Sequence, residues 1–182
     1  MLVNETKVVI LAGGLATRMR PHTETLPKSL LKVSGQPFLA HQLQALSCQG
    51  IQQVVLCVGH LAEQIEEFAG DGSAFGLQVT YSKEEGPLLG TGGALRKALP
   101  LLGEAFFVLY GDSWLEIDYP AVLKAFKKSN LPALMTVFRN EGHWDTSNVE
   151  LQAGKIQLYS KAQRNERMGH IDYGLEIGRA HV

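Results

Sequence analysis

The sequence predicts an α/β fold: a Rossmann-like, mostly parallel sheet with helices on both faces and a small β-hairpin lid. Three observations predict it. Short apolar runs rich in β-branched and aromatic residues alternate with segments of helical periodicity. The runs are apolar almost throughout, as in parallel strands that are buried on both faces. After Phe138, polar and apolar residues alternate at 147–151 and 155–159, which is typical of a hairpin.

The first seven elements alternate between strand and helix. The first helix carries Phe38, Leu39, Gln42 and Leu43 at helical spacing, and Gly50 is a typical C-terminal stop. In chain order we expect a strand at 7–12, a helix at 37–50, a strand at 53–58, a helix at 61–68, a strand at 77–81, a helix at 92–102 and a strand at 105–110. This order implies right-handed crossovers between parallel strands.

The last third of the chain continues the pattern briefly and then changes. Pro120 is suited to the first position of a helix, and Ala153-Gly154 to the turn of a hairpin. We expect a helix at 120–128, a strand at 133–138, a hairpin from 147–151 and 155–159, and a strand at 171–177. The hairpin should form a lid or wall over the carboxyl edge of the sheet.

Composition narrows the class of protein. With 182 residues and 45% hydrophobic content, the chain is long enough to bury a hydrophobic core. We therefore expect residues 1–182 to form a single domain that needs no disulfide or metal to fold. A net charge of −1 gives no broad basic field for nucleic acid, and no apolar run is long enough to span a membrane. Cys48 and Cys57 lack CxxC spacing, and their apolar neighbours suggest buried thiols in a reducing compartment. The first residues lack a basic segment followed by a long apolar stretch, so we expect a cytoplasmic protein.

The loop at residues 13–28 carries the groups that bind polyphosphate. Gly13 and Gly14 directly follow the first strand, and Arg18, Arg20 and Lys28 supply cations. Glycines let backbone N–H groups approach phosphate oxygens, and the cations form charge-assisted hydrogen bonds to them. The loop matches neither the GxxxxGK[ST] nor the GxGxxG pattern. The loop therefore predicts an anion site, with glycines that merely form a turn as the alternative.

The loop resembles the signature of the sugar-1-phosphate nucleotidylyltransferases, approximately GGxGTR[LM]xPxTxxxPK. The chain reads GGLATRMRPHTETLPK with the spacing intact, and the resemblance extends over nearly all of its length. Ala16 stands where the family usually has a third glycine, and its methyl group could crowd the triphosphate. The remaining matches imply two roles: Arg18 neutralises the triphosphate and leaving pyrophosphate, and Lys28 holds the attacking phosphate or the α-phosphate. The nucleotide is then lined by Leu11, Ala12, Gly13 and Gly14.

Asp112 is the candidate metal ligand. It follows the strand AFFVLY and a glycine, so its carboxylate should project at the carboxyl edge of the sheet, where α/β folds bind ligands. The family places a Gly-Asp here, and the resemblance implies that Asp112 binds Mg²⁺, a cation that prefers oxygen ligands. No HxxxH or His-Cys cluster predicts zinc.

A second glycine-rich segment, GPLLGTGGA, resembles the family's base and sugar segment, often PLGTGGA, with one additional leucine. Gly90 and Gly92 would open a helix whose N-terminus faces phosphate or ribose. Glu84 or Glu85 would read donor groups of the base, and we assign this role to Glu85. A solvated acidic turn is the alternative for both glutamates.

Two residues near the hairpin are candidates for the sugar phosphate. Lys161 stands where relatives carry Glu-Lys-Pro, but here Ser160 and Ala162 flank it. It is expected to hold the sugar phosphate, with a surface lysine as the alternative. Asp172 lies where relatives place polar residues that contact the sugar, and its carboxylate is expected to accept hydrogen bonds from hydroxyl groups.

The family normally supplies a second metal-binding aspartate from a later strand, and none follows Ile177. We therefore expect that the chain lacks its C-terminal portion, or that Asp172 completes the metal site.

The predicted activity is transfer of a nucleotidyl group from a nucleoside triphosphate to a sugar 1-phosphate, with release of pyrophosphate. The chain is similar both to heptose 1-phosphate guanylyltransferases, which we favour, and to muramic acid 1-phosphate uridylyltransferases. One rival is a non-catalytic nucleotide-sugar binding or remnant domain, favoured by Ala16, Ser160 and the missing aspartate. An NAD-type oxidoreductase is disfavoured because its fingerprint is absent. The family analogy also predicts self-association.

Overall fold

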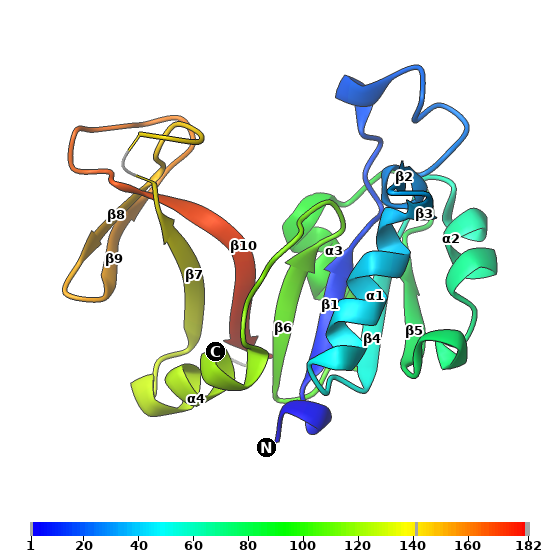
Figure 1. Cartoon of the computed structure of the whole chain (residues 1–182), viewed down its shortest axis with the longest axis horizontal. Helices are drawn as coiled ribbons and strands as arrows, with labels where there is room; N and C mark the ends of the chain where they lie inside the picture. Colours follow the sequence, from blue (N-terminus) through cyan, green and yellow to red (C-terminus); the bar gives the residue numbers. More distant parts are fainter. Residues whose placement is uncertain (1, 141, 181–182) are drawn as a thin grey trace.

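A computed structural model describes residues 2–140 and 142–180 of the chain (Figure 1). Its main sheet has eight strands, of which seven follow the order β5-β4-β1-β6-β10-β8-β9, while β7 pairs with β10. These strands are β1 (Lys7–Leu11), β4 (Gln53–Val58), β5 (Gln78–Lys83), β6 (Ala105–Tyr110), β7 (Ala133–Arg139), β8 (Val149–Gln152), β9 (Lys155–Tyr159) and β10 (His170–Arg179). A separate two-stranded sheet joins β2 (Lys32–Val33) to β3 (Gln36–Pro37).

Four neighbouring strands, β5, β4, β1 and β6, are parallel, as the sequence predicts. Val9 of β1 is in register with Val55 on one side and Val108 on the other. All three valines are buried. Strands covered on both faces have no solvent face to carry polar residues, which explains their continuous apolar runs.

Helices cover both faces of the sheet, but unequally. The helices are α1 (Phe38–Cys48), α2 (Ala62–Ala69), α3 (Gly90–Ala98) and α4 (Tyr119–Ser129). Buried residues of α1, α2 and α4 pack in one cluster with Val8, Ile10 and Phe107. On the opposite face α3 packs against Val9 and Val55. The predicted layering is therefore confirmed, with three helices on one face and α3 on the other (Figure 1).

The antiparallel strands extend the sheet beyond the carboxyl end of β6. Strand β10 pairs with β6 from Leu175 to Arg179, and its register with β7 then shifts between Asp172 and Glu176. The first residues of β10 pair with β7 and β8 instead. The predicted β8–β9 hairpin is present, and it continues the sheet beyond β10 (Figure 1).

Three details differ from the prediction. The helix expected at 92–102 is α3 followed by a 3₁₀ turn at Leu99–Leu101, because Pro100 has no N–H to continue an α-helix. The strands β2 and β3 are too short to leave a periodic signal. Cys57 is buried as expected, but Cys48 is exposed, because Leu39, Leu43 and Leu46 supply the buried face of α1. None of the described helices is long and apolar enough to span a membrane.

Candidate active site

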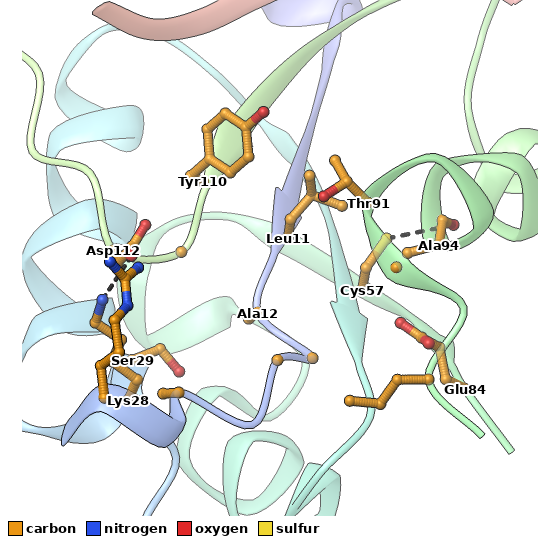
Figure 2. Close-up of a pocket in the computed structure, with 17 residues that line it drawn as sticks. Leu11, Ala12, Lys28, Ser29, Cys57, Glu84, Thr91, Ala94, Tyr110 and Asp112 are labelled. Carbon is orange, nitrogen blue, oxygen red and sulfur yellow. Dashed lines mark hydrogen bonds and ion pairs between the residues drawn. The ribbon is translucent and has the colours of Figure 1, made fainter. Parts of the chain in front are cut away.

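A cleft of about 310 Å³ opens at the carboxyl edge of the parallel strands. It lies where β1 and β6 are neighbours and the helices that follow β1 and precede β6 lie on opposite faces, the crevice in which α/β folds bind ligands. Figure 2 shows Lys28 and Asp112 on one side of it and Glu84 on the other. The cleft is lined by Leu11, Ala12, Gly13, Gly14, Ala16, Arg18, Lys28, Ser29, Cys57, Glu84, Leu88, Gly90, Thr91, Ala94, Tyr110, Gly111 and Asp112.

Two glycines let the strand ends come close together at the floor of this cleft. A Cβ on Gly13 would lie 3.0 Å from the nitrogen of Gly59, and one on Gly111 would lie 2.8 Å from the carbonyl oxygen of Leu11. A Cβ on Gly14 would meet nothing within 4 Å. Gly13 is therefore required for packing, whereas Gly14 borders open space in which a ligand fits.

The loop after β1 is fixed by a residue that the sequence analysis did not single out. Ala16 has φ 47° and ψ 42°, in the left-handed region. Thr23, which is only 2% exposed, donates a hydrogen bond from Oγ1 to the carbonyl oxygen of Ala16 at 3.0 Å. Thr23 matches the second threonine of the signature pattern, and this match is the feature of the sequence that could have indicated its role. The left-handed backbone also explains why a glycine is usual at residue 16.

Replacing Ala16 with glycine is expected to raise the free energy of unfolding by about 0.5–1 kcal/mol. A side chain in the left-handed region costs about 1–2 kcal/mol, and the greater unfolded-state entropy of glycine offsets part of the gain. Denaturant unfolding measures the change. Ala12→Gly is the matched control, because Ala12 lines the same cleft without a positive φ, and it is expected to lower stability. Equal or lower stability of A16G contradicts the prediction.

The structure brings three predicted residues together in the cleft. Lys28 donates from Nζ to Oδ2 of Asp112 at 2.6 Å, and the two side chains are 35% and 47% exposed. Arg18 lines the same cleft from the 3₁₀ turn Thr17–Met19, and it forms no ion pair with the residues that the structure describes. This part of the cleft thus combines two cations, Arg18 and Lys28, with the Asp112 carboxylate, which is paired with the Lys28 ammonium group.

The donor set suits a metal held jointly with a ligand. Residues 2–140 and 142–180 contain no group of three or more His, Cys, Asp or Glu placed to hold a metal ion. Asp112 can supply one carboxylate from the cleft wall, and Mg²⁺ is commonly bound by one or two carboxylates plus substrate phosphates. Asp172 has other partners, because its carboxylate accepts hydrogen bonds from Tyr159 and Gly174.

The second glycine-rich segment enters the cleft with partly different residues from those expected. Gly90, with φ 70°, begins α3 and lines the cleft, whereas Gly92 does not. Glu84 lines the cleft and accepts a hydrogen bond from the nitrogen of Leu89 at 2.6 Å. Glu85 is exposed outside it. Of the two glutamates, only Glu84 thus lines the cleft, because the pairing of β5 with β4 carries it to the carboxyl edge of the sheet, where its N–H donates to the carbonyl oxygen of Val58.

A second group of titratable residues surrounds the first half of β10. Asp172 accepts a hydrogen bond from the Tyr159 hydroxyl at 3.1 Å. Burial raises the pKa of Glu176, the negative charge of Asp172 raises it further, and the positive charge of Lys161 lowers it. Burial raises the pKa of Tyr110, and the charges of Glu176 and Asp172 add to this effect. Tyr110 also lines the cleft, so this group adjoins it.

Lys161 and Asp172 both lie near Glu176 and shift its pKa in opposite directions. Glu176 is not among the residues predicted from the sequence, because nothing in the pattern of its strand distinguishes it from an ordinary polar residue. Burial and the charge of Asp172 also raise the pKa of Tyr159 to about 12. The group combines two carboxylates, one ammonium and two phenols.

Replacing Glu176 with glutamine is expected to stabilise the protein at about pH 8 and to have little effect below pH 4.5, the ordinary pKa of a glutamate. Because folding raises the pKa of Glu176, ionisation costs stability as the pH rises through the folded value, and glutamine avoids this cost. Thermal unfolding across this pH range measures the difference. The exposed Glu166→Gln is the control. A gain that is the same at both pH values contradicts the prediction.

Comparison with known sequences agrees with this geometry. The family model described as Nucleotidyl transferase matches residues 7–147. N-acetylmuramate alpha-1-phosphate uridylyltransferase of Neisseria meningitidis is 42% identical over 127 residues, which cover 69% of this chain and 54% of that protein. D-glycero-alpha-D-manno-heptose 1-phosphate guanylyltransferase of Campylobacter jejuni is 37% identical over 171 residues, or 94% of this chain and 75% of that protein. The chain spans about a third to a half of the length of several curated relatives.

Solved structures share the same fold. HddC from Yersinia pseudotuberculosis aligns with 96% of this chain and 77% of that chain, with a TM-score of 0.79 and 25% identity. A UDP-glucose pyrophosphorylase complexed with UDP-glucose aligns with 98% of this chain and 76% of that chain, with a TM-score of 0.74, and its 16% identity supports the fold alone. The chain belongs to the nucleotidyl transferase family, because the family model matches residues 7–147 and the signature loop lines the cleft.

Proposed function

We propose that the protein transfers a nucleotidyl group from a nucleoside triphosphate to a sugar 1-phosphate, forming a nucleoside diphosphate sugar and pyrophosphate. One observation carries the proposal: Arg18 and Lys28 of the loop after β1, and Asp112, which lies 84 residues beyond Lys28, line one cleft at the carboxyl edge of the sheet. The two cations suit a triphosphate, and the Asp112 carboxylate suits a metal bound to that triphosphate.

The nucleotide lies against Gly13 and Gly14, with its phosphates toward Arg18 and Lys28. Lys28 exchanges Asp112 for a phosphate oxygen when the nucleotide binds. An oxygen of the sugar phosphate, already ionised, attacks the α-phosphorus, and the bond to the bridging oxygen of the β-phosphate breaks. The electron pair of that bond leaves with pyrophosphate. No general base is needed, so catalysis consists of positioning and charge neutralisation by the two cations.

Asp112 would hold Mg²⁺ together with phosphate oxygens, once Lys28 has moved to the triphosphate. The metal supplies additional neutralisation of the charge that develops during displacement. The exposed carboxylate in the cleft wall supports this assignment.

The acceptor sugar binds beside the titratable residues around the first half of β10. Lys161 contacts its phosphate, and Asp172 accepts hydrogen bonds from its hydroxyl groups. Two carboxylates, Asp172 and Glu176, favour a neutral, hydroxyl-rich sugar over one that carries a carboxylate. The acceptor we propose is therefore a heptose 1-phosphate, in preference to N-acetylmuramate 1-phosphate, whose sugar is acidic. The extensive match to the heptose guanylyltransferase, and the similarity to an HddC structure complexed with GMP-PN, support a guanine nucleotide.

The test is release of pyrophosphate in a matrix of four nucleoside triphosphates with heptose, mannose, glucose and N-acetylmuramate 1-phosphates, with and without Mg²⁺. Release is expected to be fastest with GTP and heptose 1-phosphate and to require Mg²⁺. No release with any pair contradicts the activity, while release with another pair contradicts only the assigned substrates.

A second function, non-catalytic binding of a nucleotide sugar, is favoured by the ion pair that covers Asp112. Calorimetry separates the two functions. A sensor binds the nucleotide sugar equally well with and without Mg²⁺ and shows no turnover, whereas the transferase binds it more tightly with the metal.

A further inference from the structure

Gln42 is a polar residue on the buried face of α1. Its neighbours on that face, Leu39, Leu43 and Leu46, pack in the core, and Gln42 itself is only 2% exposed. Burying a primary amide is costly unless its polar atoms form hydrogen bonds. The position of Gln42 among core leucines therefore calls for specific partners.

The partners of Gln42 flank the residue proposed to bind the metal. Its Nε2 donates to the carbonyl oxygen of Tyr110 at 2.9 Å and to that of Ser113 at 2.8 Å. Because both partners are carbonyl acceptors, the amide must present its nitrogen to them. Its oxygen has no hydrogen-bond partner among the described residues. The side chain thus bridges the two residues on either side of Gly111-Asp112.

The same short segment has two further backbone supports. The nitrogen of Gly111 donates to the carbonyl oxygen of Leu11 at 3.0 Å, and that of Ser113 donates to Tyr110 at 3.1 Å. The first contact ties the segment to β1, the second closes a turn around Asp112, and Gln42 ties both ends of that turn to α1. Asp112 itself points into the cleft with its side chain about half exposed.

We propose that Gln42 is a positioning residue that holds the Tyr110–Ser113 turn, and through it the Asp112 carboxylate, in the place that metal and triphosphate require. This role rests on the proposed function. An aspartate side chain is short, so the position of its carboxylate follows its backbone. Removing a supporting contact behind a metal ligand typically lowers metal affinity or activity by about 10- to 100-fold.

The test compares Gln42→Met, which keeps the size of the side chain and removes both donors, with Gln44→Met, the same change on an exposed position of α1. Calorimetry measures the binding of a non-hydrolysable GTP analogue with and without Mn²⁺. The factor by which Mn²⁺ tightens binding is expected to be about 10-fold smaller in Q42M than in the wild type and unchanged in Q44M. Hydrogen exchange at the Asp112 and Ser113 amides is expected to rise in Q42M alone.

A double variant that combines Q42M with Asp112→Asn tests whether Q42M acts through Asp112 or only loosens the fold. If Gln42 acts through Asp112, the double variant has the same Mn²⁺ factor as D112N. If Q42M does not fold, Gln42→Asn, which keeps the amide on a shorter side chain, takes its place. Equal Mn²⁺ factors in the Gln42 variant and Q44M, or a wild type that binds the analogue equally well without Mn²⁺, overturn the role. Failure of pyrophosphate release alone contradicts the proposed function and leaves this measurement valid.

Discussion

Replacing Lys28 with methionine is expected to lower kcat/KM for pyrophosphate release by about 10²- to 10³-fold, the usual effect of removing a preorganised group that stabilises transition-state charge. In the structure, Nζ of Lys28 lies 2.6 Å from Oδ2 of Asp112. Once the nucleotide binds, the same ammonium group is expected to contact phosphate. Methionine keeps the length of the side chain but cannot neutralise the developing charge.

The same substitution should have an opposite effect on metal binding without nucleotide. Because an ammonium group and a metal ion compete for Asp112, K28M is expected to bind Mn²⁺ more tightly than the wild type when no nucleotide is present. Electron paramagnetic resonance of Mn²⁺ measures this. Lys32→Met is the matched control, since Lys32 is exposed on β2 and does not line the cleft. Wild-type turnover in K28M would rule out the proposed role of Lys28.

The second large effect is discrimination against an acidic sugar. The wild type is expected to prefer heptose 1-phosphate to N-acetylmuramate 1-phosphate by about 10²-fold in kcat/KM. A sugar carboxylate about 5 Å from a protein carboxylate costs about 3 kcal/mol at an effective dielectric constant of about 20, before screening by solvent. The cost arises at Asp172 and Glu176, and Lys161 offsets part of it.

Neutralising both acids in Asp172→Asn/Glu176→Gln is expected to reduce this preference by about 10-fold, because the repulsion disappears while the shape of the site is kept. Paired kinetic measurements with the two sugars provide the ratio. Glu166→Gln, an exposed acid in the preceding loop, should leave the ratio unchanged. An unaltered ratio in the double variant excludes Asp172 and Glu176 as the source of discrimination.

The parallel half of the fold was predictable because its signals are local. Buried strands such as β4 and β6 are uninterrupted apolar runs, and their predicted bounds coincide with the observed ones. Strand β10 was predicted at 171–177, but its bulge was not. The bulge lies where β10 passes the end of its pairing with β6 while it stays paired with β7, and the sequence of one strand does not specify its partners.

The site was predictable where one stretch of chain carries the chemistry. The spacing from Gly13 to Lys28 indicated a polyphosphate loop, and Arg18 and Lys28 line the cleft. The sequence could not distinguish Glu84, which lines the cleft, from Glu85, which does not, because two adjacent glutamates are chemically equivalent. Strand pairing decides which of them faces the cleft.

The sequence by itself therefore determined the order of strands and helices along the chain and the loop that follows β1, and it predicted the chemical class of the ligand. The tertiary structure alone decided that Lys28 meets Asp112, 84 residues away, and that Gln42 reaches across 68 and 71 residues to the turn around that aspartate. The physical reason is that periodicity records which face of an element is buried. The contacts of a side chain on that face depend on how helices are rotated and strands are registered when the whole core packs.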